Sequence, residues 1–283
     1  MSKRSFVQFG TFCLLLLLTL AACTQPAVPE APAEPLAPTS TQTNVPTTTT
    51  TPIPEPTTPP TATPEPDLNT KLSAHYTFSG NANDSTENGN DGVVNGATLI
   101  EDRFGNAESA YDFDGIDDYI EIEHSKTIGL FARSSVSAWV YIEPQAQPTW
   151  YTIIEKSDPE RGGHSRWGLW LIRDRVEFCI QPGSTTTHHC LDSAEPVEPD
   201  SWHHVVGVWT GDTIQLYIDG ALSLEQTHGR DGISNTGRPL FFGTDLFNDT
   251  VIYTKMQLDD VRIYQRALSA EEVTELFELE STP

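Results

Sequence analysis

The sequence predicts an all-β domain, built as a sandwich of two antiparallel sheets and followed by one short C-terminal helix. Many short runs rich in β-branched and aromatic residues follow one another, and Gly, Pro, Asn and Asp separate them. No helical segments alternate with these runs, which favours antiparallel pairing within a two-sheet sandwich. Residues 67–283 are long enough to form one such domain with a full core.

The predicted strands include residues 137–142, 150–154, 167–172 and 205–209. Residues 213–218 alternate between apolar and polar side chains, and Asp219-Gly220 then makes a tight hairpin turn into residues 221–224. The helix is predicted from the capping box of residues 269–272, which is followed by the apolar stripe Val273, Leu276 and Phe277.

Residues 1–22 have the features of a secretory signal peptide. Two basic residues precede an apolar run at 12–20, which is too short for a permanent membrane helix. Residues 20–23, Leu-Ala-Ala-Cys, resemble the lipobox of bacterial lipoproteins. This resemblance implies cleavage before Cys23 and a diacylglycerol on its sulfur. The alternative is an ordinary signal peptide in which Cys23 is incidental.

Residues 23–66 form a predicted disordered linker. Residues 24–66 hold 13 of the 21 prolines and 13 threonines but no aromatic residue. Such a segment cannot bury enough apolar surface to offset the entropy of ordering, and an extended polyproline chain of this length could reach roughly 100 Å. We therefore expect an exported protein, lipid-anchored to the bacterial cell envelope, with residues 67–283 facing outward.

The folded part is strongly acidic. It carries 14 Lys and Arg against 36 Asp and Glu, a net charge of about −22. Nucleic-acid binding needs a positive face to contact phosphates, so this charge argues against nucleic-acid partners. It also argues against docking on anionic lipid, which leaves the anchor as the expected membrane contact.

Cys179 and Cys190 flank the turn signal Pro182-Gly183. A hairpin that is symmetric about residues 184 and 185 would place residue 179 opposite residue 190. In an exported protein this arrangement favours a disulfide. The alternative is a metal site in which His188 and His189 join both thiols, but adjacent strand residues point to opposite faces.

Six stretches together resemble the concanavalin A-like, laminin G-like (LamG) jelly rolls of bacterial surface proteins. They occur in the family's order at residues 75–85, 113–120, 137–140, 202–205, 216–220 and 258–264. The resemblance covers about residues 70–278. It implies a jelly roll of two curved sheets whose first and last strands pair. It does not settle function, because this fold serves lectins, adhesins, glycosidases and spacers.

The resemblance also implies a structural calcium ion near the loop after the first strand and near the last strand. Asp84, Asn88 and Asn90 lie in an oxygen-rich loop, and Asp259 lies on the last predicted strand. Calcium binds six to eight oxygens, so these four residues are the expected ligands. The alternative is a loop of Asx-turns accompanied by solvated acids.

A second candidate site would bind carbohydrate. Sugar faces stack on aromatic rings and sugar hydroxyls pair with polar side chains. Such groups concentrate around residues 157–165, at Trp150, Tyr151, His164, Arg166, Trp167 and Trp170. Trp167 and Trp170 differ by three positions, so one should be buried and the other accessible. The alternative is that all six residues pack the core or the loops.

Catalysis has weaker support in the sequence. Glu121 and Glu123 share a strand face, as a pair of glycosidase carboxylates could. The glucanase-like series of Glu, Asp and Glu on one strand is absent, as is a nucleophile elbow. We therefore expect a non-catalytic module that binds a polysaccharide or surface glycan. The alternatives are a protein-binding adhesion or spacer domain and, more distantly, a glycoside hydrolase.

Overall fold

The computed structural model describes residues 67–129, 132–143, 150–158, 164–181, 188–229, 237–247 and 250–283. Every described residue belongs to one compact unit, residues 62–283. The predicted signal peptide, Cys23 and the predicted linker lie outside the described residues. Among the residues described, no helix has the length and apolar character needed to cross a membrane.

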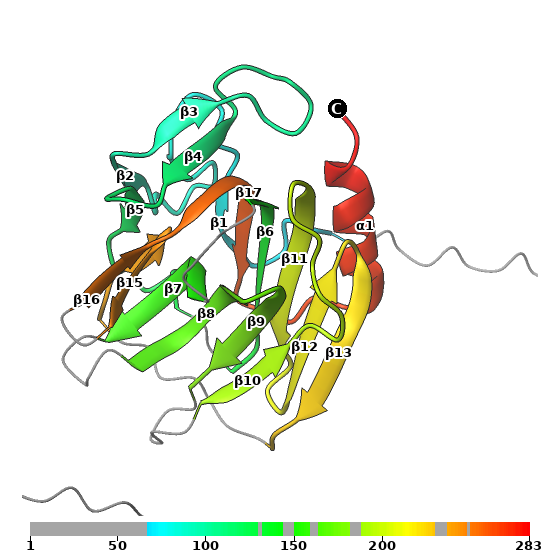
Figure 1. The fold of residues 1–283 in the computed structure, drawn as a ribbon. Helices are drawn as coiled ribbons and strands as arrows, with labels where there is room; N and C mark the ends of the chain where they lie inside the picture. Colours follow the sequence, from blue (N-terminus) through cyan, green and yellow to red (C-terminus); the bar gives the residue numbers. More distant parts are fainter. Residues whose placement is uncertain are drawn as a thin grey trace, which may run out of the picture. The chain divides into compact units, whose positions relative to one another are not determined.

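The larger of two antiparallel sheets has eight strands in the order β13-β12-β11-β6-β17-β4-β3, with β1 also paired to β17 (Figure 1). The strands are β1 (Leu72–Tyr76), β3 (Thr98–Ile100), β4 (Ala110–Asp114), β6 (Ser134–Ile142), β11 (Trp202–Trp209), β12 (Thr213–Ile218), β13 (Ala221–Thr227) and β17 (Lys255–Tyr264). Pairing of β1 with β17 confirms that the first and last strands of the domain are neighbours.

The second sheet has seven strands in the order β10-β9-β8-β7-β14-β5-β2, and β15 and β16 form a separate ribbon. These strands are β2 (Gly92–Asn95), β5 (Tyr119–Ile122), β7 (Trp150–Asp158), β8 (His164–Ile172), β9 (Arg175–Ile180), β10 (His189–Asp192), β14 (Leu240–Phe242), β15 (Thr244–Phe247) and β16 (Thr250–Tyr253). The predicted two-sheet sandwich is therefore confirmed.

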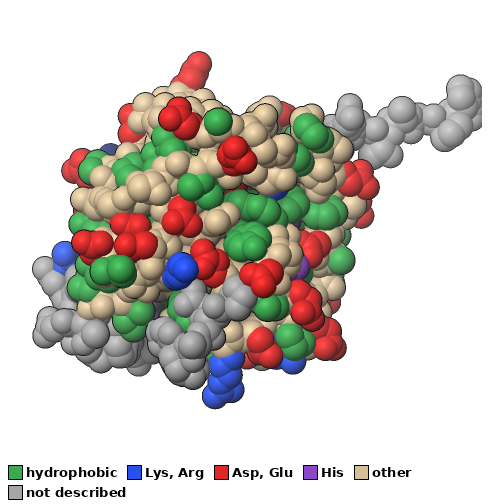
Figure 2. All heavy atoms as spheres, turned by 45° about the horizontal axis from the view of Figure 1, so that its top comes forward, with side chains coloured by type: hydrophobic (Ala, Val, Ile, Leu, Met, Phe, Trp, Pro, Cys, Tyr) green, Lys and Arg blue, Asp and Glu red, His purple; other side chains and the backbone are tan. Residues whose placement is uncertain are grey.

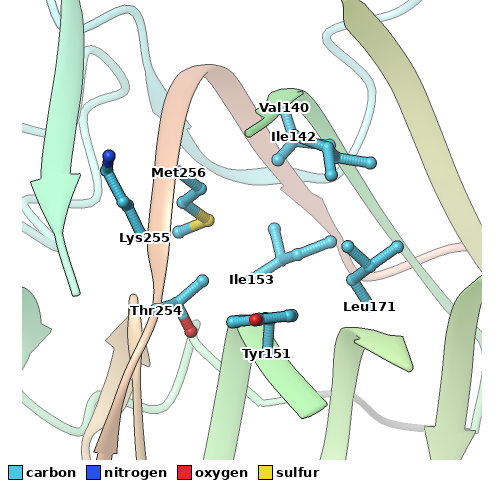
Figure 3. Close-up of a pocket in the computed structure, with 8 residues that line it drawn as sticks. All are labelled: Val140, Ile142, Tyr151, Ile153, Leu171, Thr254, Lys255 and Met256. Atoms are coloured by element: carbon cyan, nitrogen blue, oxygen red, sulfur yellow. The ribbon is translucent and has the colours of Figure 1, made fainter. Parts of the chain in front are cut away.

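The main core lies between the two sheets. Alternate residues of each strand enter it, such as Ile120 and Ile122 of β5 and Val136 and Ala138 of β6. A void of about 10 Å³ remains between the sheets, where Ile153 of β7 faces Met256 of β17 (Figure 3). A space of this size is no larger than one water molecule needs, so it offers no ligand site.

Helix α1 (Ala270–Glu280) packs on the outer face of the eight-stranded sheet, beside β11 and β13 (Figure 1). The capping box is confirmed: the Ser269 side chain accepts a hydrogen bond from the Glu272 backbone, and the Glu272 side chain accepts one from Ser269 N. Val273 and Leu276 are buried as predicted, whereas the buried Glu280 was not predicted. The predicted stripe therefore anchors the helix.

The hairpin turn between β12 and β13 lets the helix approach the sheet closely. Asp219 and Gly220 have φ values of 50° and 75°, as the predicted turn requires. A Cβ atom at Gly220 would lie 2.8 Å from Phe277 of α1. A side chain at this position would therefore push the helix away from the turn.

The predicted disulfide is confirmed. Cys190 of β10 is the register partner of Cys179 in β9, and the two residues form a disulfide. The bond closes the edge of the seven-stranded sheet. The alternative metal site at these thiols is corrected, because disulfide-bonded sulfurs are no longer thiolate ligands.

Candidate ligand-binding site

The outer face of the seven-stranded sheet presents one transverse row of side chains. Register pairing joins one residue from each strand into this row: Val93, Glu121, Phe241, Glu155, Gly168, Cys179 and Cys190. Side chains alternate along a strand, so the neighbours of these residues, such as Ile120 and Leu169, enter the core. The row therefore lies on the face that the core does not use.

A groove of about 590 Å³ lies at the β2–β5 end of this row. Its lining mixes apolar, amide, carboxylate and imidazole groups, from Val93, Asn95, Glu121, Glu123, His124, Gly237 and Pro239. Val93 is 64% exposed, so the groove opens to solvent. Its volume is in the range of small-molecule sites, and its lining suits a polar ligand with an apolar face.

Two aromatic residues lie next to lining residues in the sheet and a third contacts one of them, but none of the three is part of the lining. Tyr119 is the register partner of Asn95, and Phe241 is the register partner of Glu121. The Tyr119 ring lies 6.3 Å from the ring centroids of both Phe241 and Tyr253. Both tyrosines are partly exposed. A sugar in the groove would therefore find aromatic rings beside carboxylates, which is the usual combination in carbohydrate sites.

A buried lysine sets the protonation of His124 in the groove wall. Lys156 is 1% exposed, and its Nζ donates to the Arg238 carbonyl at 2.7 Å and lies 3.3 Å from His124 Nδ1. Burial lowers the pKa of Lys156 to about 8. Burial and the nearby Lys156 charge lower the pKa of His124. His124 is therefore neutral at pH 7 and, with Nδ1 accepting, carries its proton on Nε2.

The carboxyl groups of Glu155, farther along the row, and of its neighbour Asp245 are not accessible to ligands. Trp170 Nε1 donates to Glu155 Oε2 at 3.4 Å, and the Asp245 carboxyl is hydrogen-bonded to that of Glu155. Burial raises the pKa of Asp245. Glycosidase carboxyls stand about 5 to 10 Å apart around a sugar, whereas these two are in direct contact and buried. They do not form a glycosidase pair.

A buried serine–histidine–glutamate contact joins Ser137, His204 and Glu280. Ser137 Oγ lies 2.7 Å and Glu280 Oε2 lies 3.6 Å from the same atom, His204 Nε2. A catalytic triad uses both imidazole nitrogens and an accessible serine, but all three residues here are buried. Burial also lowers the pKa of His204 to about 3, so the contact is part of the packing.

The structure corrects part of the predicted carbohydrate set. Tyr151 and Trp167 are 4% and 1% exposed and belong to the main core, where they cannot contact a glycan. Trp170 lies on the outer face as the spacing predicts, but it is only 2% exposed because its ring covers Gly168. The prediction that one tryptophan would be accessible is therefore wrong.

The remaining predicted residues do not form one patch. Trp150 is 43% exposed at the start of β7, whereas His164 begins β8 at the other end of the same hairpin. The nine residues of β7 separate these ends by about 26 Å. His164 and Arg166 lie in β8, but their side chains are outside the described part of the structure.

Three of the predicted calcium ligands, Asp84, Asn88 and Asn90, lie in one loop. Hydrogen-bond donors of the protein already occupy the Asp84 carboxylate. Asp84 accepts five hydrogen bonds within the domain, from the backbone N–H groups of His75, Thr86 and Asn90, the Thr86 hydroxyl and the Asn90 side-chain amide. The Asn88 and Asn90 amide groups both donate to the Ser73 carbonyl. The loop is therefore closed by N–H and O–H donors, where a cation would need oxygen lone pairs.

Asp259 belongs to a different cluster. Its carboxylate pairs with Arg103, and it also accepts a hydrogen bond from the Asp260 backbone at 2.8 Å. Burial, followed by the nearby Asp260 charge, raises the pKa of Asp259, and the Arg103 charge opposes this rise. The four predicted ligands therefore do not fit a shared calcium ion in this arrangement.

The groove residues other than Glu121 and Glu123 were not predicted from the sequence. Residues 119–123 alternate between polar and apolar side chains, which places Tyr119, Glu121 and Glu123 on one face. The sequence therefore indicated which residues share this face. It did not indicate which strands pair with β5, because β2 and β14 are distant in sequence and pair with it only in the folded sheet.

The comparisons agree with this fold. A scan against protein families matches residues 114–274, more than half of the chain, to the concanavalin A-like lectin/glucanases superfamily. The chain therefore belongs to this superfamily, as the sequence motifs indicated. A comparison with curated protein sequences finds no match.

Three of the similar solved structures are binding domains. The binding domain of Paraclostridial Mosquitocidal Protein 1 has a TM-score of 0.60 and 16% identity, over 75% of this chain and 52% of that one. The ligand binding domain of botulinum neurotoxin serotype D, in complex with N-acetylneuraminic acid, has 0.56 and 18%, over 74% and 51%. The binding domain of botulinum neurotoxin DC, in complex with rat synaptotagmin II, has 0.58 and 16%, over 75% and 52%. This chain thus spans about half the length of these domains.

Proposed function

We propose that residues 67–283 form a non-catalytic module that binds carbohydrate in the groove between β2, β5 and residues 237–239. The groove itself carries the proposal, because it joins exposed apolar surface, two carboxylates, an amide and a neutral imidazole beside aromatic rings. Superfamily membership supports a binding function, since the fold serves many lectins.

A glycan array probed with the purified full chain tests this function. We expect binding that falls at least tenfold in Tyr119→Ala and in Glu121→Ala, since each removes a group at the groove. Trp150→Ala is the matched control, because Trp150 is exposed but lies at the far end of β7. Equal loss in all three variants would contradict the groove assignment, and a thermal melt of each variant excludes unfolding as the cause.

The second candidate is a protein-binding adhesion or spacer domain. Leu222 and Leu224 of β13 are 47% and 43% exposed, and β13 is an edge strand of its sheet. An edge strand with exposed leucines can pair with a partner strand. A blank array, together with loss of binding to a protein partner in Leu222→Lys, would favour this candidate over the glycan.

The proposal includes export and lipid attachment at Cys23, which would hold the module outside the cell on the Pro/Thr-rich linker. The Leu-Ala-Ala-Cys sequence and the apolar run before it support the anchor. Cell fractionation of Cys23→Ala is the test: we expect the variant to leave the membrane fraction. Unchanged membrane association would exclude the lipid anchor.

A further inference from the structure

We infer that the groove selects its sugars by charge: it takes neutral and, preferentially, amine-bearing glycans, and it rejects sialylated ones. This inference rests on the proposed carbohydrate function and names the ligand class of the same groove. It is carried by the placement of Glu121 on β5 and Glu123 just after its end, and by the residues that surround them.

Glu121 of β5 and Glu123, just after its end, point to the same side, because Ile122 between them is buried in the core. Both glutamates line the groove. Among the described residues of the lining, none has a cationic side chain. A ligand in the groove therefore meets two carboxylates of the lining, and the nearby cation Arg238, which stands between the lining residues Gly237 and Pro239, is not itself in that lining.

The buried ammonium behind the groove wall does not reach the groove surface. Lys156 Nζ is buried behind His124 and donates to the Arg238 carbonyl. The imidazole of His124, which does line the groove, has a lowered pKa and is neutral at pH 7. His124 can therefore donate a hydrogen bond to a sugar hydroxyl, but it adds no positive charge to attract an acid.

The electrostatic field of the whole chain is negative, like that of the groove carboxylates. The chain has a formal net charge of −24, and Asp and Glu side chains are spread over the face shown in Figure 2, among few Lys and Arg. A glycan carboxylate entering the groove would be desolvated beside like charges, whereas a sugar ammonium would replace its lost hydration with carboxylate contacts. Repulsion of the wrong ligand is a common source of specificity.

A botulinum neurotoxin domain, of which this chain covers 51%, was solved in complex with N-acetylneuraminic acid, which carries a carboxylate. The expected rejection in this chain comes from its own groove residues.

The test uses two matched ligand pairs at pH 7, where glutamate is ionised and His124 is neutral, and repeats them at pH 6, where more of the sugar amine is protonated. Isothermal titration of the full chain compares a glucosamine tetramer with an N-acetylglucosamine tetramer, and lactose with sialyllactose. We expect at least tenfold tighter binding of the amine than of its N-acetyl form, and at least tenfold weaker binding of sialyllactose than of lactose. Both ratios should shrink at high salt.

The double variant Glu121→Gln with Glu123→Gln keeps side-chain size and removes both charges. We expect both ligand ratios to fall to within about threefold in this variant. The control, Glu101→Gln with Glu278→Gln, removes two exposed charges near β3 and on α1 and should keep both ratios. Persistence of both ratios in the groove variant would overturn the inference.

The outcomes also separate this inference from the proposed function. Binding of neutral sugars without preference for the amine, or equal binding of sialyllactose and lactose, overturns the charge selection and leaves the carbohydrate function intact. Binding of none of the four sugars by a chain with a normal thermal melt overturns both.

Discussion

The outer faces of the two sheets hold their charged groups in opposite ways. On the eight-stranded sheet, Arg103 and Arg262 neutralise acids beneath helix α1, and all of these side chains are largely buried. On the seven-stranded sheet, Glu121 and Glu123 face an open groove without a cation among the described lining residues. Buried, paired charges fix an element in place, whereas exposed, uncompensated charges can be met by a ligand.

Arg103 connects the end of the helix to the sheet. Its Nε and Nη2 donate to the Glu280 carbonyl at 3.0 and 2.8 Å, and its other contacts are the carboxylates of Asp259 and Asp260. A cation at this end of a helix also meets the negative end of the macrodipole. Arg262 Nε pairs with the Glu280 carboxylate at 2.7 Å, which holds the same turn from the other side.

Arg103→Met should have the largest effect on stability, because it breaks the charge cluster between the eight-stranded sheet and helix α1. It leaves two buried carboxylates and the Glu280 carbonyl without Arg103, so the free energy of unfolding should fall by about 3–5 kcal/mol. Thermal and urea melts measure this loss. Lys126→Met, at an exposed site, should change stability by less than about 0.5 kcal/mol. Similar small changes in both variants would show that the cluster does not hold the helix.

Replacing Cys179 and Cys190 together by Ser tests how much the disulfide at the edge of the seven-stranded sheet contributes to stability. The bond spans a sequence separation of 11 residues, and loss of such a loop constraint should cost roughly 3 kcal/mol. The groove lies at the opposite end of the strand order, so sugar binding should change little below the melting temperature. Loss of binding in a folded double variant would show that the two ends of the sheet are coupled.

Glu177→Gln tests how burial of an acid on the seven-stranded sheet makes stability depend on pH, because Glu177 is partly buried there. Burial, then the charge of its partner Asp192, raises its pKa from 4.5 to about 7. A raised folded-state pKa gives stability that is present below about pH 4.5 and lost as pH rises through 7. The variant lacks this loss, so it should be more stable than the parent by about 1 kcal/mol at pH 8.5.

Thermal melts at pH 4.5 and pH 8.5 measure this effect: the stability difference between variant and parent is determined at each pH, and the two differences are compared. Asp174→Asn is the matched control, because Asp174 is exposed and should show the same small change at both pH values. An unchanged or lowered stability of Glu177→Gln at pH 8.5 would contradict the assigned burial penalty.

The sequence predicted local features that neighbours in the chain determine. The capping box at Ser269, the Asp219-Gly220 turn and the Cys179–Cys190 pairing each depend on residues at most 11 positions apart. Their geometry follows from turn and cap chemistry, which acts over the same short range.

The candidate site was harder to predict because long-range register builds it. Glu121 meets Val93 of β2 and Phe241 of β14 only after the seven-stranded sheet has formed. Trp170 shows the same limit, since alternation gave its face correctly but could not show that its ring covers Gly168. Composition located aromatic residues near the hairpin, whereas exposure depends on what the fold places over them.

Chelation should have the smallest effect, and it tests the Asp84 loop between β1 and β2. A calcium ion present at a hundredfold excess over its dissociation constant would contribute about 2.7 kcal/mol, so its removal would lower Tm by several degrees. Since N–H and O–H donors already occupy both Asp84 oxygens, we expect excess EDTA to shift Tm by less than about 1 °C. Asp84→Ala is the positive control: it removes these acceptors and should destabilise the domain with or without EDTA. A Tm that falls by several degrees on chelation in the parent, and not in Asp84→Ala, would show that the loop opens its carboxylate to an ion. The predicted calcium site would then be recovered in a rearranged form.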